Sequence, residues 1–224
     1  MMIAARNAFL MSGGAGPTPW QNPYITDGLV AMWDGEWNAG GGVHDANAIT
    51  WADLSNNGND LNITAGTWAA DHFVCNGAAG GKTGFINGIG TIEIVAKRTS
   101  SSTYQLAIGL NQSQSQYNRY FAISDNYANF RSSGPRLPIT INAVESFACV
   151  YAGDILYKNG AAAASAGTGD YYVTGGNYNT VLGISGSGRY PFGGMIYAIR
   201  LYSRALTAAE VAANYAIDAA RFGL

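Results

Sequence analysis

Charged side chains are scarce in this chain of 224 residues. Asp, Glu, Lys and Arg make up 12% of it, about half the share that is usual in globular proteins, and the formal net charge is −2. The sequence has no basic stretch of the kind that binds nucleic acid and no acidic run typical of a disordered tail. Uncharged polar residues, glycine and tyrosine must therefore cover the surface, and charge does not identify a partner.

Cysteine and histidine are also rare, with two of each. Cys75 and Cys149 lie in strand-like apolar runs, which leaves two interpretations: two buried free thiols, which we favour, or a disulfide. No spacing of Cys and His matches a metal site. His44 falls in a long loop and His72 precedes a strand, and neither has a nucleophile motif around it. We expect both histidines to be solvated.

The sequence also lacks a recognisable signal peptide. Residues 1–12 are apolar but are interrupted by Arg6 and Asn7, whereas a signal peptide needs a charged start and an uninterrupted apolar centre. No apolar stretch is long enough to cross a bilayer. Export by the general secretory route and a membrane span are therefore not expected.

Residues 1–23 are predicted to form an N-terminal arm and linker. The linker, residues 12–19, is rich in Gly and Pro, which makes it flexible and then stiff. The segment before it would expose apolar side chains on a free arm, so we expect it to dock on a partner surface; a disordered tail is the alternative. A homo-oligomer is the expected assembly, for example a trimer built on a bundle of arms. The assembly candidates are Ile3, Phe9, Leu10 and Met11.

Residues 24–224 are predicted to form one all-β domain. Short runs of β-branched and aromatic residues are separated by Gly, Asn and Ser, and the hydrophobic content of 48% suffices for a core. This spacing, with a single helix at the end, is typical of an antiparallel jelly-roll β-sandwich. The expected strands are 24–33, 61–64, 72–76, 90–98, 104–110, 119–124, 129–132, 146–152, 155–158, 180–184 and 195–202.

The rest of the chain is organised around its last strand and helix. Residues 195–202 are almost continuously apolar and rich in β-formers, which predicts a strand buried on both faces. Thr207 and Glu210 form a capping-box pattern that predicts a helix start, with Leu206 and Val211 as a hydrophobic staple. Helical spacing predicts the buried face of this short helix, and Gly223 is expected to end it. That face comprises Val211, Tyr215, Ala219 and Phe222.

Three stretches resemble laminin-G-like domains of the concanavalin A-like lectin and glucanase superfamily. Residues 193–211, GGMIYAIRLYSRALTAAEV, are similar to the closing strand and helix of that family. Residues 28–34 and 51–60 are similar to its opening, and residues 155–160 to its central hairpin. The resemblance spans about residues 26–223 and implies the sandwich fold. Domains of this kind occur in bacteriophage structural proteins and in gut-bacterial surface proteins.

A long loop after the first strand, residues 34–47, is rich in side-chain oxygen atoms. Calcium prefers such ligands, and the resemblance implies calcium near this opening segment. The candidate ligands are Asp34, Asp53 and Asn56. The alternative is that Asp and Asn here only form turns by bonding their own backbone, because the spacing matches no defined calcium loop. No other cofactor is expected.

Catalysis is predicted to be absent. Glucanases of this fold carry several carboxylates on one face of a strand, which divide the roles of acid and nucleophile. In the most similar strand, residues 91–98, Glu93 is followed on its own face by Val95 and Lys97. One carboxylate cannot fill both roles, so we predict a non-catalytic domain and not an enzyme.

Aromatic residues in expected loops favour binding. Tyrosine is frequent, with 14 residues, and Tyr and Trp bind both sugar rings and protein partners. The alternative is that these tyrosines only edge the sandwich, and glycan and protein ligands are both open. The candidate ligand residues are Trp37, Tyr127, Tyr172, Tyr178 and Tyr190.

Two functions remain open. The first is a bacteriophage virion structural protein, located in the virion, whose arm binds other virion proteins of the capsid or tail and whose loops face a bacterial surface glycan or protein. The second is a glycan-binding module of a bacterial cell-surface or secreted protein, which would be extracellular. The start at Met1-Met2 without a leader favours the first.

Overall fold

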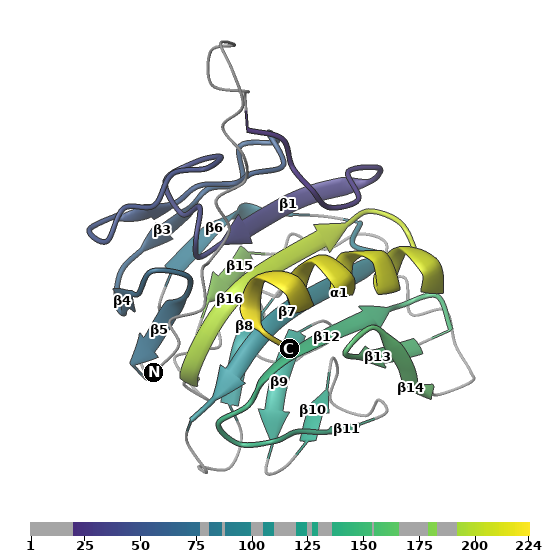
Figure 1. The fold of residues 1–224 in the computed structure, drawn as a ribbon. Coiled ribbons are helices and arrows are strands. Elements are labelled where there is room, and N and C mark those ends of the chain that lie inside the picture. The colour runs from purple at the N-terminus through teal and green to yellow at the C-terminus, as the bar shows by residue number, and fades with distance from the viewer. Residues whose placement is uncertain are drawn as a thin grey trace, which may run out of the picture.

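The computed structural model describes residues 20–76, 81–86, 88–99, 105–109, 120–124, 127–129, 136–153, 155–165, 179–182 and 192–224. These residues form two antiparallel β-sheets and one C-terminal helix (Figure 1). The predicted all-β sandwich with a short final helix is confirmed. Residues 1–19, which include the assembly candidates Ile3, Phe9, Leu10 and Met11, lie outside the described residues.

The first sheet is built on the ten-residue strand β16 (Gly193–Tyr202). One edge of β16 pairs with β7 (Thr91–Arg98), and the other edge pairs first with β5 (Phe73–Asn76) and then with β1 (Leu29–Asp34). Beyond these lie β12 (Val144–Val150), β13 (Ile155–Lys158), β14 (Ala161–Ser165) and β4 (Thr67–Trp68).

The second sheet has the order β11-β10-β9-β8-β15-β6-β3-β2. Its strands are β2 (Thr50–Trp51), β3 (Leu61–Ile63), β6 (Gly81–Phe85), β8 (Gln105–Gly109), β9 (Tyr120–Ser124), β10 (Tyr127–Asn129), β11 (Leu137–Pro138) and β15 (Asn179–Leu182).

The strand β16 is buried on both faces, as its composition predicts. Ile199 and Leu201 point into the main core between the two sheets, while Arg200 and Tyr202, which alternate with them along the strand, point to the opposite face. That opposite face is covered by α1 (Ala208–Phe222), which lies across β16 and β7 (Figure 1). The molecule therefore has three layers, and its last helix closes the first sheet.

The predicted helix boundaries are confirmed. Thr207 accepts a hydrogen bond from the Glu210 N–H, and the Glu210 carboxylate accepts one from the Thr207 N–H, which completes the capping box. Leu206 and Val211 belong to one buried cluster, as expected of a staple. Gly223 has a φ of 71° and ends the helix in the left-handed conformation.

The predicted buried face of α1 is partly wrong. Val211 and Phe222 are buried as expected, but Asn214 and Asp218 lie between them at 0% exposure. Tyr215 and Ala219 are only half-buried. The helix is rotated toward two polar residues because the sheet beneath it presents a buried arginine, described below.

The first strand begins later than predicted, at Leu29 instead of residue 24. The segment before it bonds to the helix: Tyr24 Oη donates to Asp218, and the Ile25 N–H donates to Asn214 Oδ1. The third residue of a turn, Gly28, has a φ of 74° and leads into β1. Strand β10 covers residues 127–129 and includes the first residue of the predicted strand 129–132, whose other residues lie outside the described ones. Strands β2, β4, β6, β11 and β14 were not expected.

Cys75 and Cys149 are both buried thiols that form no disulfide, as the favoured interpretation predicts. Burial raises the pKa of the Cys75 thiol to about 12. In the part of the chain that the structure describes, no helix is long and apolar enough to cross a membrane.

Candidate ligand pocket

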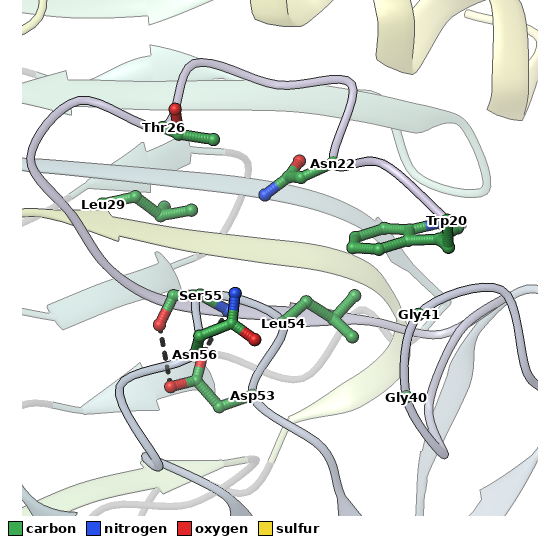
Figure 2. Close-up of a pocket in the computed structure, with 10 residues that line it drawn as sticks. All are labelled: Trp20, Asn22, Thr26, Leu29, Gly40, Gly41, Asp53, Leu54, Ser55 and Asn56. Carbon is green, nitrogen blue, oxygen red and sulfur yellow. Dashed lines mark hydrogen bonds between the residues drawn. The ribbon is translucent and has the colours of Figure 1, made fainter. Parts of the chain in front are cut away.

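A pocket of about 410 Å³ lies where three connecting segments meet beside β1. Figure 2 shows Trp20 and Gly41 at one end of it, Leu29 toward the other, and Thr26 across from Asn56. The segment before β1, the loop after β1 and the turn after β2 supply its walls. The lining residues are Trp20, Asn22, Thr26, Leu29, Gly40, Gly41, Asp53, Leu54, Ser55 and Asn56.

The Trp20 ring forms an aromatic wall that its neighbours hold in place. It meets the Trp37 ring edge to face, with centroids 5.2 Å apart and an angle of 72° between the planes. A Cβ atom at Gly41 would lie 2.4 Å from Trp20 Cε3, so only glycine permits this close approach. Trp37, a predicted ligand residue, thus supports the wall and does not line the pocket.

The floor of the pocket is a turn fixed by Asp53. Its Oδ1 accepts hydrogen bonds from the N–H groups of Met32 and Ser55, each at 2.9 Å, and its Oδ2 accepts from Ser55 Oγ at 2.8 Å and the Asn59 N–H at 2.9 Å. These four bonds use the roughly four lone-pair positions of a carboxylate. Asp53 therefore ties the turn to β1 and offers no free acceptor to a ligand.

Two neutral polar residues that line the pocket, Thr26 and Asn56, have no side-chain hydrogen-bond partner in the described residues. Asn56 has a φ of 66°, a left-handed conformation that Asn tolerates better than most residues. Asn22 is partly engaged, because its Oδ1 accepts from the Tyr24 N–H at 3.0 Å. The pocket thus combines an aromatic ring and the aliphatic Leu29 and Leu54 with free hydroxyl and amide groups.

A second hollow, of about 510 Å³, lies near the edge strands β2 and β4. Its lining is mainly apolar and includes Ala48, Ile49, Ile63 and Trp68, and Ile49 is 79% exposed. Because fewer polar side chains converge there, the pocket beside β1 is the better candidate for a polar ligand.

A buried ionic cluster lies between the first sheet and α1. Arg200 Nε donates to Glu93 Oε2 at 2.7 Å, and Arg200 Nη1 donates to Asp218 Oδ1 at 2.9 Å. All three side chains belong to residues no more than 2% exposed. Burial lowers the pKa of Arg200, but the carboxylates of Asp218 and Glu93 raise it more, so the net pKa is well above its ordinary value. Asn214 Nδ2 also donates to Glu93.

Arg221 connects this helix to the pocket wall. Its guanidinium donates to both oxygens of Asp34, at 2.7 and 2.8 Å, and to Glu36 at 2.8 Å. The same group lies 3.8 Å from the centroid of the Trp37 ring. The aromatic pair of Trp20 and Trp37 therefore rests on the end of α1.

Comparison with protein families agrees with this architecture. The model of the "Concanavalin A-like lectin/glucanases superfamily" matches residues 90–212, more than half of the chain. The chain belongs to this superfamily. The matched region contains β7, β16 and the start of α1, whereas the pocket beside β1 is formed by residues that precede it. The pocket is thus a feature of this chain that the family match does not describe.

Solved structures share the fold of this superfamily member at low sequence identity. A Trypanosoma rangeli sialidase in complex with sialic acid has a TM-score of 0.64 at 16% identity, over 93% of this chain and 35% of the sialidase. A mutant of that sialidase displaying trans-sialidase activity has a TM-score of 0.63 at 14% identity, over 87% and 33%. The CBM40 of a Ruminococcus gnavus IT-sialidase, bound to α2,3-sialyllactose, has a TM-score of 0.49 at 20% identity, over 62% and 94%.

The similarities to the two sialidase structures show the fold alone. The chain spans about a third of the length of the sialidases, so their activity does not transfer to it. A comparison with curated proteins finds no match.

Two of the three predicted calcium ligands, Asp34 and Asp53, are engaged by other groups of this superfamily member. Asp34 is fully buried and both its oxygens bind Arg221, while Asp53 is saturated by its own turn. Burial raises the pKa of the Asp34 carboxyl, and the hydrogen bonds from Arg221 oppose that rise. Among the described residues no group of three or more His, Cys, Asp or Glu could hold a metal ion. Calcium binding stays a prediction that needs a direct measurement.

The remaining predicted ligand residues lie elsewhere. Tyr127 is 42% exposed on β10 of the second sheet, away from the pocket lining. Tyr172, Tyr178 and Tyr190 are outside the described residues. Trp20 was missed because its position among Pro17, Pro19 and Pro23 is typical of a linker.

Proposed function

We propose that this protein is a non-catalytic glycan-binding module that works outside the cell or on a surface, and that it binds a sugar in the pocket beside β1. The observation that carries the proposal is the composition of that pocket. One fixed aromatic ring and two aliphatic side chains adjoin neutral polar groups that have no other partner among the described residues.

A sugar ring matches this lining. Its C–H groups can pack on Trp20, Leu29 and Leu54, because aromatic and aliphatic carbons gain from contact that excludes water. Its hydroxyl groups can form hydrogen bonds with the Asn56 amide and the Thr26 hydroxyl, because each of these side chains has both a donor and an acceptor. The volume of about 410 Å³ equals roughly 14 water molecules at about 30 Å³ each, which is room for one sugar ring.

The pocket is also preorganised. The Trp20 ring is held by Trp37 and Gly41, and Asn56 sits on a turn that Asp53 ties to β1. Groups that are fixed before binding lose less conformational entropy when a ligand arrives. A rigid site of this kind supports binding even though the pocket is small.

Absence of glycoside hydrolysis is part of the proposal. Glu93 shares Arg200 with Asp218, and none of these residues is more than 2% exposed, so a substrate cannot reach the two carboxylates. We expect no release of reducing ends from β-glucans or galactans. Glycosidase turnover that is lost in the Glu93→Gln variant would refute the predicted absence of catalysis.

Calorimetric titration of a sugar panel tests the binding function. Trp20→Ala removes the aromatic wall, and Asn56→Gly removes the amide while glycine keeps the left-handed backbone. Both should weaken binding of the same sugars at least about tenfold, which is about 1.4 kcal/mol.

Two matched variants serve as controls. Tyr127→Ala removes an exposed aromatic ring from β10, and Asn142→Gly makes the same substitution at another asparagine with a φ of 66°. Both should bind like the wild type. Equal loss in all four variants, or no loss with Trp20→Ala, would refute the assignment of the pocket.

The virion location stays a prediction. It rests on the apolar residues 1–12 and their linker, which lie outside the described residues. Deleting residues 1–19 should leave the melting of the sandwich nearly unchanged and abolish self-association. A truncated chain that still self-associates would contradict a role of the arm in assembly.

A further inference from the structure

We infer that the pocket beside β1 selects uncharged sugars and discriminates against sugar acids. This inference rests on the proposed glycan-binding function and concerns the class of ligand. The expected ligand class differs from the ligand named for one sialidase of similar fold, which was solved in complex with sialic acid.

The pocket offers no positive charge to an acidic ligand. None of the described residues that line it is Lys, Arg or His, and Asp53 is the one ionisable group among them. A carboxylate that leaves water needs a cation or several hydrogen-bond donors in exchange. Here it would meet a negative side chain instead, so the charge of the lining favours a neutral ligand.

Two arginines that pack against the segments forming the pocket, Arg204 and Arg221, cannot supply the missing charge without breaking ion pairs. Arg204 packs beside Gly28 and pairs with Asp27 at 2.8 Å and Glu210 at 2.6 Å. Arg221 pairs with Asp34, which is fully buried. Turning either guanidinium toward the pocket would leave carboxylates unpaired.

A bridging cation is no better supported. The four hydrogen bonds that Asp53 accepts hold its turn together, so a metal ion would have to replace donors of the backbone. The free groups are the Asn56 amide and the Thr26 hydroxyl, which pair readily with neutral hydroxyl groups. Binding should therefore survive a chelator.

The test compares sugars that differ only in charge or in one acidic unit. Lactose is titrated against 3′-sialyllactose, galactose against galacturonic acid, and glucose against glucuronic acid, all in the presence of EDTA. At least one neutral sugar should bind, and its acid partner should bind at least about tenfold more weakly. The difference should shrink at high salt, because screening weakens the repulsion from Asp53.

A second variant makes the test independent of the wild-type affinity. Thr26→Arg places a guanidinium at the rim and should raise the affinity for the acids, while Thr26→Gln, a neutral side chain, should not. Suppose that sugar acids bind the wild type with the same affinity as neutral sugars, and that Asn56→Gly weakens this binding. That result would overturn the inference and leave the proposed function standing. Absence of binding by every sugar would overturn both.

Discussion

Replacing Arg200 by methionine should destabilise the protein strongly. Arg200 neutralises Glu93 and Asp218 and lies over the Tyr24 ring, 4.1 Å from its centroid. Methionine keeps an unbranched apolar stem but leaves two carboxylates in a region that is no more than 2% exposed. Removing one partner of a buried ion pair costs about 3–5 kcal/mol, and this arginine serves two carboxylates.

Arg204→Met is the matched control. Arg204 also forms two ion pairs, with Asp27 and Glu210, but its side chain is 29% exposed. Solvent screens such pairs, so the expected loss is about 1 kcal/mol or less. Urea denaturation followed by circular dichroism gives the loss of unfolding free energy for both variants. The comparison requires that the slope of the unfolding free energy against urea concentration is unchanged.

The outcome separates two views of the cluster. If Arg200→Met costs no more stability than Arg204→Met, the cluster is hydrated and Arg200 is not buried. A further variant, with Glu93→Gln and Asp218→Asn added to Arg200→Met, should recover part of the loss, because no buried charge then remains.

Further predictions concern the core, the helix cap and the thiols. Leu201→Ala should cost about 2–5 kcal/mol and Thr207→Ala about 1 kcal/mol, and denaturant melts that rank the cap variant as the worse would contradict the burial of β16. Hydrogen bonds from Arg204 and Thr207 lower the pKa of Glu210 from 4.5 to about 2, so its contribution to stability is present above pH 4.5 and is lost as the pH falls to about 2. The difference in unfolding free energy between wild type and Glu210→Gln should shrink over that range, and a constant difference would argue against it. Cys75 should react with a thiol reagent only on unfolding, and rapid labelling of the native protein would contradict its burial.

Patterns that depend on neighbours in the sequence predicted the structure well. The capping box of Thr207 and Glu210, the C-terminal Gly223 and the strand Ile155–Lys158 are all as expected. Each of these is set by a local motif or by a compact run of β-forming residues. The buried strand β16 was also predictable, because its composition leaves no polar face for water.

Features that depend on distant contacts could not be predicted. Asn214 and Asp218 look like surface residues of α1, and only the position of Arg200 beneath them makes their burial favourable. Strand β14, Ala161–Ser165, consists mainly of alanine, which is a weak strand former, and pairing with β13 determines its conformation. Trp20 resembles a linker residue in the sequence, and only its contact with the loop that contains Gly41 shows that it belongs to the pocket.

The Trp20 indole offers the most direct measurement of ligand binding. In the described residues Trp33, Trp51 and Trp68 donate their indole N–H to backbone carbonyls, whereas Trp20 has no such bond. In a ¹⁵N-resolved NMR titration with the best neutral sugar, the Trp20 indole resonance, assigned with Trp20→Phe, should shift with a saturating dependence. The Trp51 resonance should stay in place. A titration in which other resonances shift with added sugar and the Trp20 indole resonance does not would contradict a sugar site beside β1.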